Sequence, residues 1–272
     1  MKISATIIAL NEERNLPRAL DSLDCVDEVV VVDSGSADRT REVARRHGAR
    51  VTENPWPGYA AQKNLAAARA AHDWILSIDA DEALSEQLSA EIMRLKQQGP
   101  RAAGYRMPRR AQYLGRWILH SGWYPDHKLR LYDRRRGRWV GDYVHERVQV
   151  DGPVETLSAD LLHYTCESLS QHLRTLDRYT TLAAQELRGQ GRRAGPARLL
   201  LAPPWTFLKT YLLQQGFRDG YPGLLISSMA AWYVFLKWAK TLQSSQHSAF
   251  SSQRFAVKDV PKSAKGGQEP ES

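Results

Sequence analysis

Cysteine is scarce in this sequence of 272 residues, which contains Cys25 and Cys166 and no others. The two lie far apart and lack the spacing of metal ligands, so we expect free thiols in a reducing compartment. The chain also lacks an uninterrupted run of about 18 to 20 apolar residues, which disfavours a simple membrane-spanning helix. No internal repeat is visible. The length allows one large domain or a domain with an appendage.

The N-terminus does not have the pattern of a signal peptide. Residues 1–10 are apolar, but they run directly into the polar sequence Asn11-Glu12-Glu13-Arg14. No small-residue cleavage site follows the apolar part. A first β-strand at residues 2–10 is therefore predicted.

Acidic residues are fewer than basic ones: the chain has 30 Asp and Glu and 38 Lys and Arg, which gives a formal net charge of +8. The basic residues do not form one long tail. They are spread through Arg-rich stretches at residues 39–50, 106–138 and 188–198. This balance suits anionic partners such as nucleic acid, sugar nucleotides or acidic lipid surfaces.

Strand-like and helix-like segments alternate through the first hundred residues. Further strands are predicted at residues 28–33, 49–53 and 74–78, and a helix rich in alanine runs from about Tyr59 to Ala71. The four consecutive valines of the second strand show no polar face, which predicts burial on both sides. The alternation is typical of a parallel, doubly wound α/β sheet.

The pattern changes after a helix at about residues 85–97, which Gly99-Pro100 ends. Residues 102–163 contain short strand-like runs with many aromatics and arginines, and predict an antiparallel extension folded against the first sheet. A helix is expected from Ser168 to about residue 189, with Ser168 as its cap.

Two apolar, aromatic segments lie within residues 196–242, where Lys and Arg interleave with Trp and Tyr. That pattern is typical of helices at a membrane interface. A pair of core helices or an oligomer interface are the alternatives. From Gln243 the chain is rich in Ser, Lys, Gly and Pro, which predicts a disordered tail at residues 243–272.

Three carboxylates, Asp79, Asp81 and Glu82, follow the strand at residues 74–78 directly. Open α/β sheets bind ligands at the carboxyl ends of their strands. Close carboxylates repel one another unless a cation lies among them, and aspartate oxygens suit Mg²⁺ or Mn²⁺ bridged to phosphates. An acidic loop is the alternative for Asp79-Ala80-Asp81 taken alone.

Two further polar clusters end strands at the same predicted edge. Asn11 and Glu12 follow the first strand, and Asp33 ends the second. Taken alone, Asn11-Glu12 indicates the start of a helix. Asp33-Ser34-Gly35-Ser36 taken alone indicates a capped turn. Because the strand ends converge at one edge, the three clusters together predict one site.

These runs resemble the signature sequences of family 2 glycosyltransferases. The matching segments are residues 6–13, 31–40 and 79–82. The resemblance implies the Rossmann-like GT-A fold and an inverting enzyme that uses nucleotide-activated sugars. Further segments are similar to lipopolysaccharide core glucosyltransferases that add a β-1,4-glucose to the first heptose; they are residues 62–64, 124–131, 144–146 and 163–164.

The resemblance also implies roles for individual residues. Asp33 would accept from the nucleotide base, with Asn11 and Glu12 lining the base and ribose pocket. Asp81 would hold the divalent ion, with Asp79 bonding the ribose or the sugar. The remaining residues assigned to nucleotide-sugar binding are Ala9, Ser34, Gly35, Lys63, Ala80 and Arg130.

Several of these assignments keep alternatives. Lys63 and Arg130 are candidates for phosphate contacts. The alternatives are that Lys63 is a solvated helix lysine and that Arg130 is a surface arginine. His163 is a candidate second metal ligand, or a structural histidine. Trp117, Trp123 and Tyr124 suit a sugar-stacking acceptor wall, but aromatics also fill cores.

An inverting transfer needs one base to take the proton of the acceptor hydroxyl. Glu146, in Val144-His145-Glu146, is the first candidate and Asp142 the second, with Asp126 third. His145 is a candidate for orienting the base, or a loop histidine.

The resulting hypothesis is a metal-dependent inverting hexosyltransferase. It would act on a lipid-anchored lipopolysaccharide core at the cytoplasmic face of the inner membrane, with UDP-glucose as donor and no nucleic-acid partner. This hypothesis divides the chain into a catalytic domain at residues 1–190 and a membrane-associating region at residues 196–242. Within the catalytic domain, residues 1–98 form a nucleotide-sugar-binding half, residues 99–167 an acceptor-side half and residues 168–190 a closing helix.

Two other functions are the alternatives. A sugar-phosphate nucleotidyltransferase would keep the nucleotide-binding edge, but such enzymes usually open with a Gly-rich phosphate loop. Leu10-Asn11-Glu12-Glu13 contains no glycine. A non-enzymatic module that binds a membrane surface would leave the converging carboxylates without a purpose.

Overall fold

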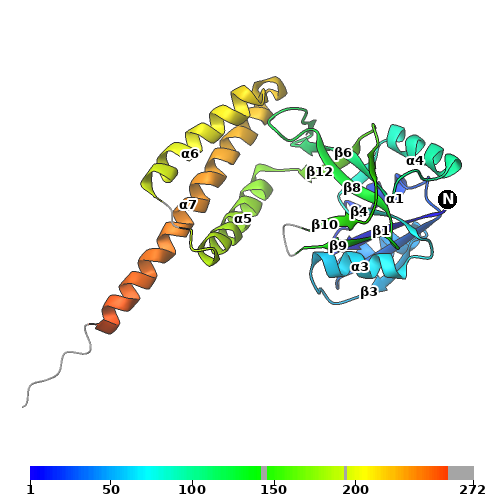
Figure 1. Ribbon diagram of the computed structural model, residues 1–272, viewed down its shortest axis with the longest axis horizontal. Coiled ribbons are helices and arrows are strands. Elements are labelled where there is room, and N and C mark those ends of the chain that lie inside the picture. Colours follow the sequence, from blue (N-terminus) through cyan, green and yellow to red (C-terminus); the bar gives the residue numbers. More distant parts are fainter. Residues whose placement is uncertain (142–145, 193–194, 257–272) are drawn as a thin grey trace, which may run out of the picture. The chain divides into compact units, whose positions relative to one another are not determined.

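The computed structural model describes residues 1–141, 146–192 and 195–256 (Figure 1). The chain divides into two compact units, which are described separately. Unit 1 comprises Met1–Leu169 together with Gln214–Leu224, and unit 2 comprises Ser170–Leu213 with the chain from Leu225 onward. The division differs from the predicted one, since the expected closing helix belongs to unit 2.

A parallel half-sheet forms the N-terminal part of unit 1. Its strand order is β3 (Arg50–Glu53), β2 (Glu28–Asp33), β1 (Ile3–Ala9) and β4 (Trp74–Asp79). Ala9 on β1 pairs with Asp33, and Ile8 pairs with Asp79. The predicted α/β class and parallel strands are confirmed, and three of the polar clusters lie at one sheet edge.

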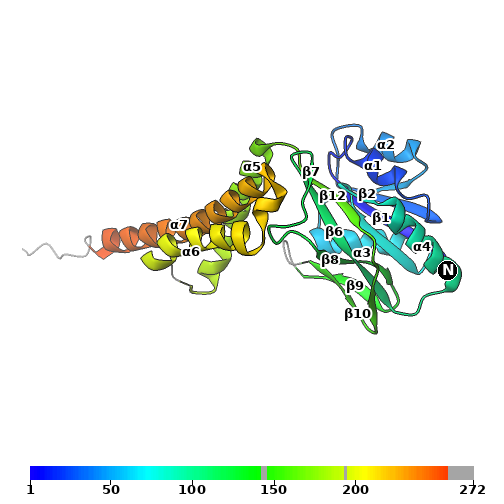
Figure 2. The same cartoon turned by 90° about the horizontal axis from the view of Figure 1, so that it is seen from above.

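Helices and a hairpin cover the two faces of this half-sheet (Figure 2). One face packs on α1 (Leu16–Asp21), α2 (Thr40–Arg46) and α4 (Glu86–Gln98). The other packs on α3 (Tyr59–Arg69) and on a separate two-stranded antiparallel sheet of β9 (Gly137–Val140) and β10 (Arg147–Val150). Val31 belongs to the first core cluster and its neighbours Val30 and Val32 to the second, so burial of the valine run on both sides is confirmed.

The predicted antiparallel extension continues the first sheet instead of folding against it. β8 (Asp126–Asp133) pairs antiparallel with β4, and β6 (Gly104–Tyr113), β12 (Leu161–Cys166) and β5 (Glu82–Leu84) follow in order. β7 (Arg116–Trp117) and β11 (Val154–Thr156) pair with β6, which makes ten strands in all. The backbone hydrogen bonds that β4 leaves on one side are therefore satisfied by β8, which a separate layer would not do.

Unit 2 is helical. It contains most of α5 (Leu169–Gly189), α6 (Pro196–Leu208), a π-helical turn η1 (Lys209–Leu213) and most of α7 (Tyr221–Ala256). Lys240 on α7 binds Asp177 on α5 at 2.6 Å, and Arg188 donates to the Lys240 carbonyl. These contacts explain why α5 belongs with α7. No helix in the described part of the chain is both long and apolar enough to cross a bilayer.

The C-terminal boundary also differs from the predicted one. α7 continues to Ala256, past the expected start of a disordered tail at Gln243. Residues 257–272 lie outside the described residues, so the tail stays a prediction there.

Candidate functional site

The loops after β1 and β2 are tied together by hydrogen bonds. The Asn11 amide donates to the Ser36 hydroxyl at 2.9 Å, and the Asn11 side-chain oxygen accepts from the Ala37 amide at 2.8 Å. The Glu12 amide donates to the Thr40 hydroxyl at 2.8 Å. Asn11 itself adopts a left-handed backbone conformation with φ 57°. The amide side chain of Asn11 therefore shapes this edge of the sheet.

Asp33 is completely buried at the end of β2. Its carboxylate accepts from the amides of Gly35 (3.1 Å) and Ser36 (2.9 Å), and from the Ser36 hydroxyl. These bonds form the capped turn that the sequence offered as an alternative. Ala9, also assigned to donor binding, is buried beside it on β1, whereas Ser34 is partly exposed and Gly35 is exposed.

Glu12 shows that the loop after β1 comes close to the carboxylates after β4. Burial raises the pKa of Glu12, the Asn15 side chain lowers it by donating a hydrogen bond, and the negative charges of Asp81, Asp38 and Asp79 raise it again. The structure thus brings the predicted clusters together at one edge.

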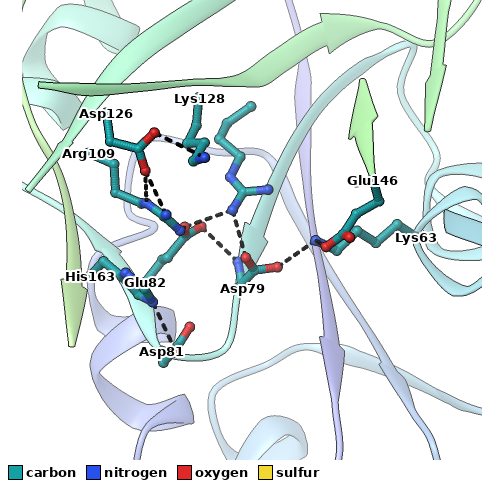
Figure 3. A network of polar contacts seen from close by, with 10 residues as sticks. Lys63, Asp79, Asp81, Glu82, Arg109, Asp126, Lys128, Glu146 and His163 are labelled. Carbon is teal, nitrogen blue, oxygen red and sulfur yellow. Dashed lines mark hydrogen bonds and ion pairs between the residues drawn. The ribbon is translucent and has the colours of Figure 1, made fainter. Parts of the chain in front are cut away.

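Asp79 lies between two buried cations (Figure 3). Lys63 Nζ is 2.7 Å from Asp79 Oδ1, and Arg130 Nη2 is 2.6 Å from Asp79 Oδ2. Burial acts to raise the pKa of Asp79, but Arg130 and Lys63 outweigh it and hold that pKa well below the usual carboxyl range. Asp79 is therefore a permanently ionised carboxylate with a fixed orientation.

Glu82 is the third carboxylate of this network and binds the same arginine as Asp79. It is 1% exposed, and its Oε1 accepts from Arg130 at 2.7 Å and from Arg109 at 3.2 Å, while its Oε2 accepts from the Asp79 amide. Burial acts to lower the pKa of Arg130, and the carboxylates of Asp79 and Glu82 raise it above its ordinary value. Glu82 is thus a buried carboxylate that fixes the positions of Arg130 and Arg109.

Lys63 and Arg130 are more enclosed than the sequence suggested. They are 3% and 4% exposed, and both lie over the indole ring of Trp139, at 4.1 and 5.5 Å from its centroid. Both cations therefore position Asp79, instead of extending freely toward a phosphate. Trp139, on the hairpin of β9 and β10, is a part of the site that sequence reasoning missed.

Asp81 differs from Asp79 in its partner more than in its exposure, because 35% of its side chain is exposed against 30% for Asp79, and the ion pair recorded for it is with His163 instead of a lysine or arginine. Its Oδ2 lies 3.2 Å from His163 Nε2. His163 reaches it because β12 pairs with β5 and places His163 opposite Glu82. The two predicted metal ligands, 82 residues apart in sequence, are thus neighbours.

A divalent cation fits this pair incompletely. A carboxylate oxygen and an imidazole nitrogen are suitable donors for Mn²⁺ or Mg²⁺. Within the described residues, no group of three His, Cys, Asp or Glu side chains is close enough to hold a metal ion. Asp81 and His163 therefore supply part of a coordination shell, and such ions commonly complete it with substrate phosphates and water.

A cavity of about 370 Å³ opens beside His163, on the strands of the second half of the sheet. Its polar lining includes Arg109, Asp126, His163 and Thr165, and Trp123 supplies an aromatic face. Arg109 Nη2 binds Asp126 at 2.7 Å and Lys128 binds its other oxygen at 3.0 Å. Burial acts to raise the pKa of Asp126, but Arg109 and Lys128 lower it overall.

Of the three candidates for the base, Glu146 and Asp126 are among the described residues, and they lie in different places. Glu146 Oε1 is 4.0 Å from Lys63 Nζ, on the side of Asp79 away from His163 in Figure 3. Asp126 lines the cavity. Asp142 and His145 lie outside the described residues.

The predicted aromatic wall is brought together in part. Trp123 lines the cavity, whereas Tyr124 donates from its hydroxyl to Asp160 at 2.9 Å and Trp117 packs on Tyr164. Ala80 is buried in the turn between the two aspartates. Arg109, which joins Glu82 to the cavity, was missed because an arginine on a strand carries no sequence signal of its partners.

Comparison with known proteins agrees with this geometry. Residues 4–150 match the family described as Glycosyl transferase family 2. The lipopolysaccharide core biosynthesis glycosyltransferase LpsC of Rhizobium meliloti (strain 1021) is 32% identical over 250 residues, covering 89% of this chain and 93% of that protein. An uncharacterized glycosyltransferase of Rickettsia felis is 34% identical over 261 residues, covering 89% of this chain and 90% of that protein.

Solved structures match over a smaller part or with lower similarity. Glucosyl-3-phosphoglycerate synthase from Mycobacterium tuberculosis, solved in complex with Mn²⁺, UDP and phosphoglyceric acid, is 27% identical. That match covers 40% of this chain and 43% of the other, with a TM-score of 0.35.

Proposed function

The chain belongs to glycosyl transferase family 2, and on that premise we propose that it moves a hexose onto a heptose of a lipopolysaccharide core or a similar lipid-linked glycan. UDP-glucose is the first candidate donor. The observation that carries the proposal is the contrast at the end of β4, where Asp79 is neutralised by two cations and Asp81 stays accessible beside His163 and the cavity. The similarity to the lipopolysaccharide core biosynthesis glycosyltransferase of Rhizobium meliloti supports the acceptor class.

The nucleotide side of the proposed site is the edge formed by the loops after β1 and β2. Asp33, Asn11 and Glu12 shape that edge, and the exposed turn at Ser34 and Gly35 offers backbone groups to a base. Asp79, oriented by Lys63 and Arg130, accepts from hydroxyls of the ribose or of the hexose. An ionised carboxylate held in one position is a strong acceptor for such hydroxyls.

Asp81 and His163 would hold the divalent ion, either Mg²⁺ or Mn²⁺. A bound ion of this kind neutralises charge that develops on the departing nucleoside diphosphate. The partly exposed side chain of Asp81 is accessible to a diphosphate on the donor side, and His163 lines the cavity on the proposed acceptor side.

In an inverting transfer, the acceptor hydroxyl oxygen bonds to the anomeric carbon as the bond from that carbon to the diphosphate breaks. The hydroxyl proton passes to a carboxylate base. We assign this role to Glu146, whose ion pair with Lys63 is long, at 4.0 Å, because Lys63 is already bound to Asp79. Glu146 lies on the side of Asp79 away from His163 (Figure 3), so this assignment requires the reacting hydroxyl to extend from the cavity past Asp79. Asp126 is held by two cations that lower its pKa, which weakens it as a base.

The cavity beside His163 is the proposed acceptor site. An indole face and charged hydroxyl-binding groups are the side chains that recognise a sugar ring, whose two faces are apolar and whose edge is polar. Trp123 supplies the first, and Arg109 and Asp126 supply the second.

A lipid-linked acceptor suits unit 2, which contains all of the net positive charge. Unit 1 has equal numbers of basic and acidic residues, so the formal charge of +8 belongs to unit 2. No Asp or Glu occurs between Glu186 and Asp219. Anionic lipid headgroups attract such a segment.

The same segment exposes apolar side chains at helical spacing. The large side chains at least 45% exposed on α6 and η1 are Leu200, Leu201, Trp205, Leu208, Leu212 and Leu213. Four of them, at positions 201, 205, 208 and 212, follow the three-and-four spacing of one helix face. We propose that this face lies in the interfacial layer of the inner membrane, on its cytoplasmic side.

Nucleotide titration tests the proposal first. UDP should bind more tightly with Mn²⁺ than with a chelator present, and a donor screen against purified heptose-terminated lipopolysaccharide should add the mass of one hexose. Preference for a nucleoside triphosphate would favour a nucleotidyltransferase instead. Absence of nucleotide binding would leave a surface-binding module.

A further inference from the structure

The wall of the cavity beside His163 is formed partly by a loop with an unusual backbone. Residues 118–125 join β7 to β8, and Gly122, Trp123 and Pro125 from this loop line the cavity. Ser121 and Gly122 both adopt left-handed conformations, with φ 59° and 73°. Serine is disfavoured there because its Cβ approaches the backbone, so surrounding contacts must hold Ser121 in place.

Those contacts come from a segment nearly a hundred residues away. Residues 214–224, here called the strap, follow η1 and include the first four residues of α7, and they belong to unit 1. Asp219 of the strap accepts from the amides of Leu119 (3.2 Å) and His120 (3.0 Å) and contacts His120 Nδ1 at 2.9 Å. The Asp219 side chain is 5% exposed, so a buried carboxylate accepts these bonds, which are charge-assisted.

The strap also contacts the two left-handed residues directly. The Ser121 amide donates to the Gln214 carbonyl at 2.9 Å, and the Ser121 hydroxyl lies 3.5 Å from Asp219 Oδ2. The Gln214 side chain lies so close to Gly122 that a Cβ there would come within 2.6 Å of it. The strap therefore holds the loop from Leu119 to Gly122 at every residue.

We propose that Asp219 is a positioning residue for acceptor recognition, because through the strap it fixes the loop that places Trp123 and Pro125 in the cavity wall. The inference rests on the proposed assignment of the cavity to the acceptor sugar. The inference does not concern the donor edge or the Asp81–His163 pair. Among the described residues, the hydrogen bonds recorded for Asp219 go to the loop and not to these two places.

Asp219→Ala removes the two oxygens that accept from Leu119, His120 and the Ser121 hydroxyl, and Asp219→Asn keeps one of them. With a deacylated, heptose-terminated lipopolysaccharide oligosaccharide as the probe, Asp219→Ala should raise the acceptor KM by about 10- to 100-fold, since small misplacements of a binding wall have effects of that order. Asp219→Asn should have a smaller effect. The KM for UDP-glucose and the affinity for UDP should stay within twofold of wild type.

Asp177→Ala is the matched control, because Asp177 also binds a partner far away in sequence, Lys240, but does so within unit 2. It should leave the acceptor KM unchanged. Gly223→Ala is a second way to disturb the strap, because a Cβ at Gly223 would crowd the Gly216 backbone and lie 3.1 Å from the Asp219 Cβ, while Gly223 itself does not line the cavity. A Cβ at Gly223 would lie 1.8 Å from the Gly216 carbonyl oxygen, so this variant should reproduce the rise in acceptor KM.

Hydrogen exchange separates failure of this inference from failure of the proposed function. Amides at residues 118–125 should exchange at least tenfold faster in Asp219→Ala, with β1 to β4 unchanged. An unchanged loop, or an equal rise in donor and acceptor KM, would overturn the positioning role. A wild-type protein that transfers no hexose to the oligosaccharide would overturn the proposed acceptor, and the exchange result would then decide the role of Asp219 in shaping the cavity.

Discussion

Replacing Arg130 by methionine should destabilise the protein more than any exposed ion pair would, because Arg130 joins two carboxylates inside unit 1. Its Nη2 lies 2.6 Å from Asp79 and 2.7 Å from Glu82, and the residue is 4% exposed. Methionine fills similar space but leaves both carboxylates with less positive charge nearby. Glu82 keeps Arg109 and the Asp79 amide, and Asp79 keeps Lys63.

Removal of one member of a buried ion pair costs about 3 to 5 kcal/mol. Two features reduce the expected figure. The Asp79 side chain is 30% exposed, so water screens part of its charge, and both carboxylates retain a cation. We therefore expect a loss of about 2 to 4 kcal/mol in the free energy of unfolding. At about 2 to 4 °C per kcal/mol for a unit of this size, Tm should fall by about 4 to 16 °C.

Thermal unfolding followed by circular dichroism measures this change, and Arg46→Met is the control. Arg46 also pairs with a glutamate, Glu42, but their side chains are 71% and 50% exposed. The control should shift Tm little, because exposed pairs add little stability. Equal shifts in the two variants, or no shift in Arg130→Met, would refute the view that the buried network stabilises unit 1.

The pH dependence of the Tm difference between wild type and Arg130→Met gives a second test. Arg130 and Lys63 hold the folded-state pKa of Asp79 below its usual range. That stability is fully present above the unfolded carboxyl pKa of about 3.9 and is lost as pH falls toward the folded value. The difference in Tm between wild type and Arg130→Met should therefore be constant near neutrality and narrow below about pH 4.

Three further predictions concern the proposed reaction. Asp81→Ala, or chelation of the wild type, should remove turnover and the Mn²⁺ dependence of UDP binding; full activity after both would contradict the metal role. Glu146→Gln should abolish transfer and leave UDP affinity unchanged, whereas the same outcome from Asp126→Asn would place the base in the cavity. Trp205→Glu should reduce sedimentation with vesicles containing anionic lipid by about tenfold or more, since a largely exposed indole would lose its burial in the interface. Turnover of a deacylated acceptor should be unaffected, and equal binding to neutral vesicles would argue against the charge contribution.

The parallel half of the fold was predictable because its signals are local. Buried strands without alternation and polar residues at their ends are visible in the sequence, and parallel topology then brings Asn11, Asp33 and Asp79 to one edge. The observed pairing of Ala9 with Asp33 and of Ile8 with Asp79 confirms that placement. Roles of the individual residues in binding remain predictions.

The partners of those residues could not be predicted in the same way. Glu82 meets Arg109 and Arg130, which lie 27 and 48 residues later on other strands. Strand periodicity indicates which face a residue occupies, but it does not specify which strands become neighbours. The pairing of β4 with β8 was not predicted for this reason. The burial of Lys63 and Arg130 was not predicted either.

The strap was hidden for a related reason. Residues 196–242 show apolar and aromatic helical character, so no sequence signal separates the strap from the helical segments on either side. Asp219 stands out there as an acidic residue after a long stretch without one. Its partners are amides of a loop about 100 residues earlier, and backbone groups leave no trace in a sequence.

The discontinuity of unit 1 has a consequence for synthesis on the ribosome. The strap emerges some 45 residues after Leu169, where the first part of unit 1 ends. At about 5 to 20 residues per second, the sheet and its acidic edge are present for roughly 2 to 9 seconds before the strap is made. The edge that holds Asp79 and Asp81 is therefore ready to fold early. The cavity wall is the last part of unit 1 to be completed, and a nascent chain stalled before residue 214 is expected to bind nucleotide before it can bind a sugar acceptor.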